Sequence, residues 1–382
     1  MRTLKVSRIP AEDEALREPV RAFLEDYLKG FSAEKRAKTW MGVDRDFTRA
    51  LAARGWIGLT LPKEWGGGGR SPFARFVLLE ELLIAGAPAG AHWAAERQSA
   101  PLILRFGSEE QKRLVVPAIC SGELSFCIGM SEPDAGSDLA SVRTRAELTP
   151  KGWRLNGTKV WTSFGHQADY MIALVRTSGK YGDRSAGLSQ LLIDLQTPGI
   201  TRRPIQDIAG DEHFSEIHFD NVLLPQSALI GAEGDGWKQV VAELAFERSG
   251  PERIYSSSVL VNEWVQYIRT RGAVTAMEKV IAGRLFAQLA VLRNMSLSVT
   301  SLLREELSPV VEATVVKDLG TSFEQSVPEL IADHLAGEPF DGIPQSLIET
   351  LQYTEAMSPS FSLRGGTREI LRGIIARGLG VR

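Results

Sequence analysis

The sequence contains little cysteine and no long uninterrupted apolar run. Cys120 and Cys127 are its only cysteines, and their spacing matches no metal-binding or redox motif, which favours a reducing, cytoplasmic setting. The longest apolar stretch, residues 76–95, is interrupted by Glu80 and Glu81, and a stretch interrupted in this way does not span a bilayer. The first residues include no apolar run of signal-peptide length. We therefore expect a soluble protein that does not insert into membranes.

A surplus of positive charge is absent as well. The formal net charge is −3, whereas proteins that bind nucleic acid carry a basic surface. No nucleic-acid partner is therefore expected. No internal repeat is present, which argues against a solenoid. A chain of 382 residues exceeds a single small core, and about two or three structural units are expected.

Apolar residues recur with helical spacing in the first third of the chain. Residues 16–28 place their apolar side chains on one face of a helix. A second helix is predicted over residues 73–81. A third begins near Ser108, where Gln111 three residues later completes a capping box. The glycine-rich segment 61–70 between the first two helices is predicted to be a non-helical turn.

From about Ser125 the pattern changes to short strands. Residues 152–163 are predicted to form two strands joined by a tight turn at Asn156–Gly157, a dipeptide typical of β-hairpins. Further strands are predicted at residues 170–176, 188–195 and 216–219.

Helices return after Gly236. One long helix carries an apolar face made by Leu285, Leu289, Leu292, Val299 and Leu303, with Met295 beside them. The predicted fold class is therefore α+β. We expect a helical domain over residues 1–124, a β domain over residues 125–232 and a helical domain over residues 233–382.

Five segments of the sequence carry recognisable motifs. They are FGSEEQKRLVVPAICSGE (106–123), MSEPDAGSDLA (130–140), KVWTSFG (159–165), FDNVLLPQSALIGAEGDGW (219–237) and GGTREILRGIIARGLG (365–380). Each resembles a segment of the acyl-CoA dehydrogenase family, and they occur in that family's order. The resemblance implies an N-terminal helical domain, a small β-barrel-like middle domain and a C-terminal helical bundle, with FAD as cofactor. It also implies α,β-dehydrogenation of an acyl-CoA, with electrons passed to an electron-transferring flavoprotein.

A flavin that accepts a hydride needs hydrogen-bond donors at its pyrimidine edge, where negative charge accumulates. The resemblance implies that the backbone at Ile128 and Met130 and the hydroxyl of Ser131 contact the flavin ring. Trp161 would cover one side of the ring. Ser163, which is predicted to share a face with Trp161 on one strand, would form a hydrogen bond near N5. Without the resemblance, these segments would be interpreted as a β-turn and as a core tryptophan beside a strand serine.

Three further positions match family contacts with cofactor or substrate. Ser137 would approach the cofactor or the phosphates of CoA, and we assign it to substrate binding. Thr367 and Glu369 match positions that contact the cofactor. Thr367 is equally suited to cap a helix, and the two roles are compatible.

The catalytic base is expected to be a carboxylate in an apolar pocket, because desolvation raises its proton affinity. Most of the family carries this glutamate directly before the Gly-Thr of the closing motif, where the sequence has Gly365. A minority, including isovaleryl- and some long-chain enzymes, carries it on an earlier helix directly before an arginine. Glu247 and Arg248 match that pair, so Glu247 is the predicted base and Arg248 a thioester- or CoA-side contact. Glu243, one helical turn earlier, is the nearest competitor.

Family members hold the adenine half of a neighbour's FAD through two segments. Neither segment has a counterpart in this sequence. Residues 270–280 and 351–360 contain neither an Arg-x-x-Phe-Gly nor a Gln-x-x-Gly-Gly stretch. The dinucleotide tail could be held differently, by a dissimilar partner subunit, or weakly. We expect a homo- or hetero-oligomer, either a dimer or a tetramer.

Two alternative functions remain open. One is a catalytically silent subunit of a hetero-oligomer, and the other is a flavin oxidase or monooxygenase on the same scaffold. The identity of the acyl group is open too. Gly365 leaves space where relatives carry a glutamate, which favours branched or bulky acyl groups.

Overall fold

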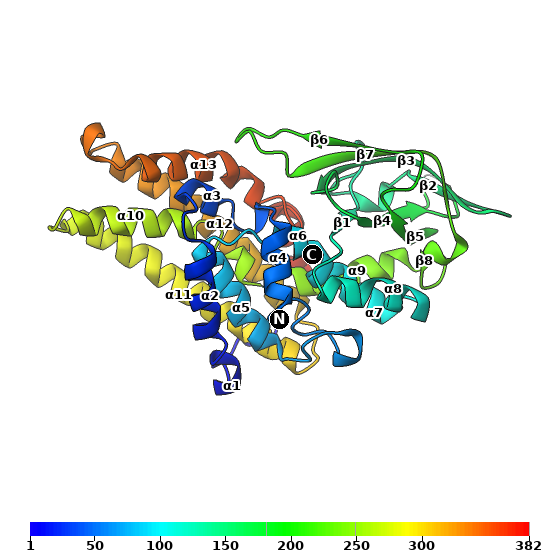
Figure 1. Ribbon diagram of the computed structural model, residues 1–382, viewed down its shortest axis with the longest axis horizontal. Helices are drawn as coiled ribbons and strands as arrows, with labels where there is room; N and C mark the ends of the chain where they lie inside the picture. The colour runs from blue at the N-terminus through cyan, green and yellow to red at the C-terminus, as the bar shows by residue number, and fades with distance from the viewer. Residues whose placement is uncertain (181, 249, 382) are drawn as a thin grey trace. The chain divides into compact units, whose positions relative to one another are not determined.

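The computed structural model describes residues 1–180, 182–248 and 250–381, and the side chains of residues 243–247 and 340 also lie outside that description. The chain forms two compact units. The first contains Met1–Gly42, Arg70–Ala89 and Ala245–Arg382, and the second contains Val43–Gly69 and Gly90–Leu244. Figure 1 shows the first unit as a set of helices and the second as a sheet with helices. The α+β class is confirmed, and the division into three domains stays a prediction.

The first unit is built from helices. They are α1 (Ala11–Glu14), α2 (Arg17–Tyr27), α3 (Ala33–Ala37), the 3₁₀ turn η1 (Thr39–Met41), α5 (Pro72–Ala85), the 3₁₀ turn η6 (Pro251–Arg253), α10 (Ser258–Thr270), α11 (Ala276–Arg304), α12 (Val310–Leu335), the 3₁₀ turn η7 (Phe340–Gly342), α13 (Gln345–Phe361) and α14 (Arg368–Gly378). The stripe predicted over residues 16–28 coincides with α2, which buries Val20 and Leu24. The helix predicted over residues 73–81 is α5.

Glu80 and Glu81, which interrupt the apolar stretch of α5, are buried and paired with arginines. Glu80 lies 2.9 Å from Arg17 and 2.6 Å from Arg293, and Glu81 lies 2.7 Å from Arg21. Buried charges persist in proteins only when they are paired, so these pairs fix how α2, α5 and α11 pack. None of the described helices combines the length and the hydrophobicity that a membrane span requires.

The second unit combines helices with a sheet. Its helices are α4 (Arg45–Ala52), the 3₁₀ turn η2 (Lys63–Trp65), α6 (Gly90–Ala94), the π-helical turn η3 (Ala95–Ser99), α7 (Ala100–Phe106), α8 (Glu109–Cys120) and the 3₁₀ turns η4 (Leu139–Ser141) and η5 (Gln226–Ala228). α9 (Gly236–Glu247) begins here and runs across the boundary between the units. The predicted capping box is confirmed at the start of α8, where Ser108 accepts from the Gln111 amide. In the glycine-rich segment, only Lys63–Trp65 forms a helical turn.

The sheet follows the order β6-β7-β3-β2-β4-β5-β8, and β1 pairs with β4. The strands are β1 (Phe126–Gly129), β2 (Arg145–Thr149), β3 (Gly152–Ser163), β4 (Tyr170–Arg176), β5 (Leu188–Asp194), β6 (Ile200–Ile205), β7 (Phe214–Leu224) and β8 (Leu229–Ile230). β2 meets β4 at a single pair, Arg145 with Arg176. Trp153 and Leu155 of β3 nevertheless share one apolar core with Met171 of β4. The sheet therefore curls around this core, whereas Ile172, on the opposite face of β4, packs with α7 and α8.

The predicted hairpin at Asn156–Gly157 is wrong. β3 runs unbroken from Gly152 to Ser163, and the turn lies earlier, where Thr149 of β2 pairs with Gly152. Asn156 and Gly157 instead lie opposite an extra residue in β7, because Leu155 pairs with Val222 and Gly157 with Phe219. The Asn156 side chain accepts a hydrogen bond from the Asn221 amide at 2.8 Å. The dipeptide thus accommodates a β-bulge in the neighbouring strand.

Gly157 provides a test of this packing. A Cβ atom there would lie 2.5 Å from Thr144 Oγ1 and 2.7 Å from Thr144 Cα. We expect Gly157→Ala to lower the free energy of unfolding by about 3 kcal/mol, because the backbone before β2 must move. Gly210→Ala is the control, since its φ of 84° is also positive but its Cβ would meet nothing within 4 Å. It should cost about 1 kcal/mol. Urea unfolding measures both, and equal losses would contradict the interpretation.

Candidate functional site

The predicted flavin-contacting loop follows directly after β1. Ile128 pairs with Ile172 in the parallel β1–β4 ladder, and the chain leaves the sheet at Met130 and Ser131. All three predicted residues, Ile128, Met130 and Ser131, are half-buried, whereas Ser137 is exposed. Near the beginning of the loop, a tight turn forms in which the Glu132 amide donates to the Ala135 carbonyl at 2.8 Å. The predicted contacts thus lie on the rim of the sheet's core.

A β-bulge in β3 determines which way Trp161 points. Lys159 pairs with Ile217 and Thr162 with Ser215, so β3 carries one more residue than β7 between these pairs. Trp161 lies in the bulge with φ of 58°, a left-handed conformation that is strained for an aromatic residue. Thr162 is buried, while the Trp161 side chain is 59% exposed and Ser163 is exposed. Trp161 and Ser163 therefore do face the same side, as alternation around Thr162 predicts.

The exposed surface around Trp161 is suited to a planar group. The indole meets the Phe214 ring edge to face, with centroids 6.1 Å apart, so it is held from one side and open on the other. In the part of the chain that the structure describes, no hydrogen bond engages the hydroxyls of Ser131 or Ser163. A flavin ring needs an apolar cover and hydrogen-bond donors, and these residues offer both. The residues present therefore fit the ring.

Lys159 and Val160, which were given no role in the sequence interpretation, connect the loop to β3. Lys159 is completely buried, and its ammonium donates to the Met130 carbonyl at 3.0 Å and to Glu132 at 2.8 Å. The Val160 amide donates to the Ser131 carbonyl at 3.0 Å. Strict alternation along β3 places Lys159 on the same face as Trp153 and Leu155, and a lysine on an inward face requires a partner. That signal was present in the sequence.

The environment shifts the pKa values of both members of this pair. Burial lowers the pKa of Lys159 to about 8, against the opposing effect of Glu132. For Glu132, burial alone would raise the pKa. The Lys159 ammonium and the hydrogen bonds from Thr144 and Arg143 outweigh burial, and the pKa is lowered. The carboxylate is therefore ionised at neutral pH, as an ion pair requires.

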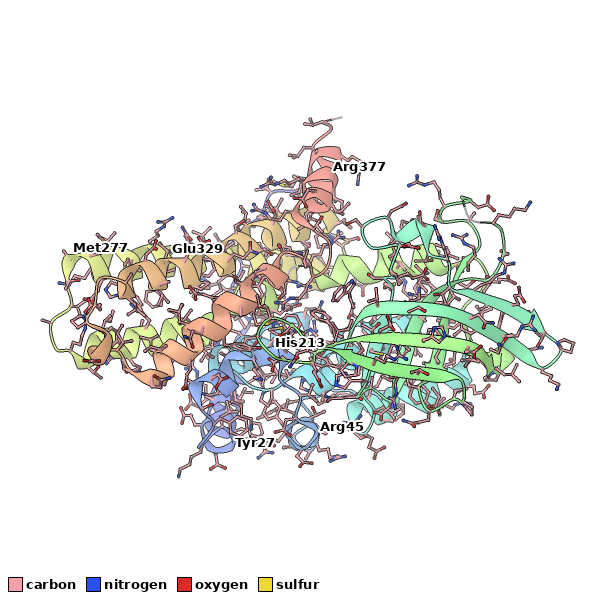
Figure 2. The ribbon with its side chains drawn as sticks, turned by 90° about the horizontal axis from the view of Figure 1, so that it is seen from above. Tyr27, Arg45, His213, Met277, Glu329 and Arg377 are labelled. Carbon is pink, nitrogen blue, oxygen red and sulfur yellow. The ribbon has the colours of Figure 1, made fainter. Side chains whose placement is uncertain are left out.

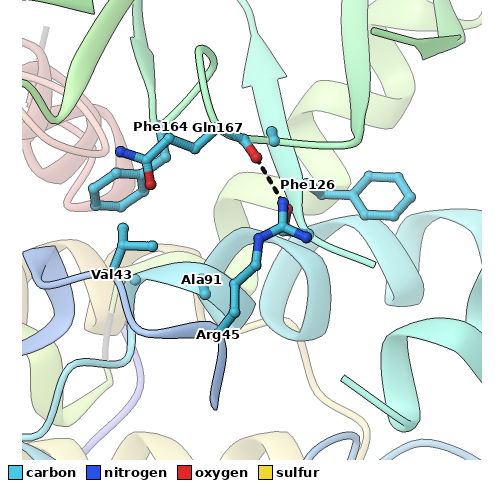
Figure 3. Close-up of a pocket in the computed structure, with 9 residues that line it drawn as sticks. Val43, Arg45, Ala91, Phe126, Phe164 and Gln167 are labelled. Atoms are coloured by element: carbon cyan, nitrogen blue, oxygen red, sulfur yellow. Dashed lines mark hydrogen bonds between the residues drawn. The ribbon is translucent and has the colours of Figure 1, made fainter. Parts of the chain in front are cut away.

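A hollow of about 220 Å³, which includes space open to solvent, lies beside the segment that follows β3 (Figure 3). Arg45 reaches into it, but its guanidinium donates to the Gln167 carbonyl at 2.6 Å and to Ser125 Oγ at 2.9 Å. It also pairs with Asp169 at 3.1 Å. The space left free inside it is about that of one water molecule. The Arg45 guanidinium is engaged by these partners, so Arg45 braces the turn that contains Phe164 and Gln167.

In the first unit, the predicted site residues gather at the glycine pair before α14. Arg248 is buried, and its Nε donates to the Gly365 carbonyl at 3.1 Å. The ammonium of Lys317, which is completely buried, donates to the Gly366 carbonyl at 2.8 Å. Two cations therefore hold two successive carbonyl groups. Lys317, on α12, is a further residue to which the sequence analysis assigned no role.

Thr367 caps α14, as one of its two predicted roles requires. Its hydroxyl accepts from the Ile370 amide at 3.5 Å. Glu369 lies exposed in the first helical turn, and its pKa is lowered by a bond from its own amide and by the Thr367 hydroxyl. Both residues are thus available at the start of α14, next to the carbonyls that Arg248 and Lys317 hold.

The predicted base lies at the end of a helix. α9 ends at Glu247, directly before the buried Arg248. The side chains of Glu247 and of its competitor Glu243 lie outside the described residues. The assignment of the base therefore stays a prediction.

Residues 270–280, one of the two segments that lack an adenine-side motif, join α10 to α11. Met277 marks this end of the helical bundle in Figure 2. Arg271 forms ion pairs with Glu278 and Glu338, and His334 lies 3.2 Å from Glu278. Glu278, His334 and Glu338 have metal-site spacing, but the guanidinium already neutralises part of the cluster. Burial lowers the pKa of His334. Within this cluster, two carboxylates face one guanidinium.

Two protein-family models match the chain. The N-terminal domain of acyl-CoA dehydrogenases matches residues 10–123, and the middle domain of acyl-CoA dehydrogenases matches residues 127–222. The acyl-CoA dehydrogenase IpdE1 of Mycobacterium tuberculosis is 34% identical over 372 residues, which cover 95% of this chain and 96% of that protein. FadE26, another acyl-CoA dehydrogenase of the same organism, is 29% identical and covers 97% of each chain.

Solved structures show the same fold over the whole chain. The Tcur3481-Tcur3483 steroid ACAD superposes with a TM-score of 0.87 at 27% identity, covering 98% of this chain and 99% of that one. The ChsE4-ChsE5 complex of Mycobacterium tuberculosis gives 0.83 at 27% identity, covering 99% of each. Family models, a relative of nearly equal length and whole-chain superposition agree: the chain belongs to the acyl-CoA dehydrogenase family of flavoprotein oxidoreductases.

Proposed function

We propose that this protein binds FAD and converts an acyl-CoA thioester into its α,β-unsaturated enoyl-CoA. The observation that carries the proposal is the strained, exposed Trp161 at the bulge of β3, with the unengaged hydroxyls of Ser131 and Ser163 nearby. Strain in a backbone persists where the surrounding structure and a function maintain it. Membership of the acyl-CoA dehydrogenase family supplies the reaction class.

Each site residue has a role in this proposal. Bound FAD would supply the acceptor for a hydride from the β-carbon and pass the electron pair to an electron-transferring flavoprotein. Trp161 covers one side of the ring and excludes water, while Ser131, Ser163 and the backbone at Ile128 and Met130 orient its polar edge. Ser137 takes the substrate side, and the start of α14 contributes Thr367 and Glu369.

Glu247 removes the proton from the α-carbon. The α C–H electron pair then forms the new double bond as the β-hydride leaves, so protons and electrons balance. Arg248, next in sequence, holds the Gly365 carbonyl and so fixes the loop beside which the thioester is proposed to lie. The position of the base before an arginine supports this assignment.

The acyl group is proposed to be bulky. Gly365 carries no side chain where most relatives have a glutamate, and this leaves room near the reacting carbons. The Tcur3481-Tcur3483 protein is described as a steroid ACAD, so a steroid-derived acyl-CoA is the substrate class to test first.

The active form is proposed to be an oligomer with a related but different chain. Two of the solved relatives are named as pairs of chains, and residues 270–280 lack the motif through which the family contacts a neighbour's cofactor. α11 also exposes a strip formed by Met277, Val280, Ala287 and Val291, with Arg284 between them. A cytoplasmic location is proposed because both cysteines are buried free thiols.

Flavin binding is tested first through Trp161. We expect Trp161→Ala to weaken FAD binding by about 2 kcal/mol, as truncation of a central aromatic contact does, and to alter the flavin absorption band. Trp237→Ala, which removes a tryptophan 36% exposed on α9, should change neither. Titration with FAD under visible spectroscopy measures both. A folded wild-type chain that stays colourless after soaking with FAD would instead favour a silent subunit.

The base is tested by Glu247→Gln, which preserves shape and removes the proton acceptor. Turnover should fall by roughly 10² to 10⁴, the usual value of a positioned general base, with FAD content unchanged. Glu243→Gln, one turn earlier on α9, is the matched control and should retain activity. Steady-state assays with a panel of acyl-CoA substrates measure both variants. Full activity in Glu247→Gln together with loss in Glu243→Gln would transfer the assignment to Glu243.

The exposed strip on α11 is tested by placing an acidic residue in it. Val280 is 65% and Val291 59% exposed, and Asp at either position should weaken association, because a charge buried in an interface loses its hydration. Leu148→Asp, at a position 57% exposed on β2, is the control. Light scattering across a concentration series should show smaller particles only for the α11 variants. Unchanged assembly in both would place the interface elsewhere.

A further inference from the structure

We infer that Lys159 and Glu132 are positioning residues for the cofactor loop: their buried ion pair holds both ends of residues 130–144 against β3. The inference rests on the proposed function, because it concerns the loop that is proposed to contact FAD. Neither residue is assigned to flavin contact itself. They act through Met130, Ser131 and Trp161.

Lys159 fixes the beginning of the loop. Its ammonium donates to the Met130 carbonyl at 3.0 Å and to Glu132 Oε1 at 2.8 Å, with none of the side chain exposed. The next residue, Val160, donates its amide to the Ser131 carbonyl at 3.0 Å. Two successive carbonyls of the loop are thus held by two successive residues of β3.

Glu132 fixes the end of the same loop. Its Oε2 accepts from the Arg143 amide at 2.6 Å and its Oε1 from the Thr144 amide at 2.9 Å, directly before β2 begins. The carboxylate therefore receives two backbone amides and one ammonium. Both ends of the loop meet at one ion pair, and the residues between them, including Ser137, extend from it.

The sequence makes room for the lysine. A Cβ atom at Gly129 would lie 2.7 Å from the Met171 sulfur and 3.3 Å from Lys159 Cγ. An alanine would press mainly on the flexible Met171 thioether and only slightly on the Lys159 stem. Glycine at this point of β1 therefore leaves room for both side chains beside the path of Lys159 to the Met130 carbonyl.

Stability alone does not account for a pair of this kind. A buried ion pair replaced by apolar side chains of similar volume often leaves a protein as stable or more so. Apolar side chains cannot donate to the Met130 carbonyl or accept from the Arg143 and Thr144 amides. What the charged pair supplies is one fixed loop conformation, which a cofactor-binding segment needs.

The test is Lys159→Met in the full chain, with two readouts. In the FAD-free protein, the Val160 amide should exchange its hydrogen faster, because the Ser131 carbonyl is no longer held in place. In the FAD titration, the dissociation constant should rise about 10- to 100-fold, as on loss of other groups that hold ligand-binding residues. The flavin band should shift as well. Glu132→Gln, which keeps the side-chain shape, should change both readouts in the same direction by less.

Val175→Ala separates loop positioning from general destabilisation. Val175 is completely buried in the sheet's core, so this variant should lower the melting temperature while leaving Val160 exchange and FAD affinity as in the wild type. If Lys159→Met and Glu132→Gln bind FAD like the wild type, with unchanged Val160 exchange, the inference is overturned and the proposed function stands. If the wild type itself binds no FAD, the proposed function fails, whereas faster Val160 exchange in Lys159→Met would still support the loop-holding role.

Discussion

The single extra residue in β3 between Lys159 and Thr162 is the constraint on which the candidate flavin surface depends. In a regular strand, Trp161 would share the inward face of Trp153, Leu155 and Lys159. The bulge reverses that alternation, so Lys159 stays inside and the indole turns outward. Beside the bulge, the Val160 amide donates to the Ser131 carbonyl. The irregularity thus exposes an aromatic ring next to the point where the loop is attached.

The two compact units hold their site segments by the same physical means. Lys159 donates to the Met130 carbonyl in one unit, and Lys317 donates to the Gly366 carbonyl in the other. Both lysines are completely buried, and both segments lie outside regular ladders, where their carbonyls have no strand or helix partner. Unsatisfied buried carbonyls are costly. A buried ammonium satisfies them and at the same time limits the segment to one position.

Local patterns were sufficient to predict much of the fold. The capping box at Ser108, the amphipathic residues 16–28 and the strand at residues 170–176 each depend on neighbours within a few residues, and the structure confirms them. Asn156–Gly157 was misinterpreted because a bulge in β7, a distant segment, decides its conformation. The same limit applies to the site. The motifs identified the segments that surround Trp161 and Gly365, but the roles of Lys159 and Lys317 depend on carbonyls far away in the sequence.

The departure at Gly365 has a structural reason as well as a chemical one. Gly365 has a φ of 69° and Gly366 a φ of 106°, and both values lie where residues with a Cβ are strained by about 1–2 kcal/mol. This conformation turns the two carbonyls toward Arg248 and Lys317. A glutamate at position 365 would have to adopt the left-handed conformation or pull its carbonyl away from Arg248. The loop therefore favours glycine at position 365, and this preference is consistent with the proposed base on α9.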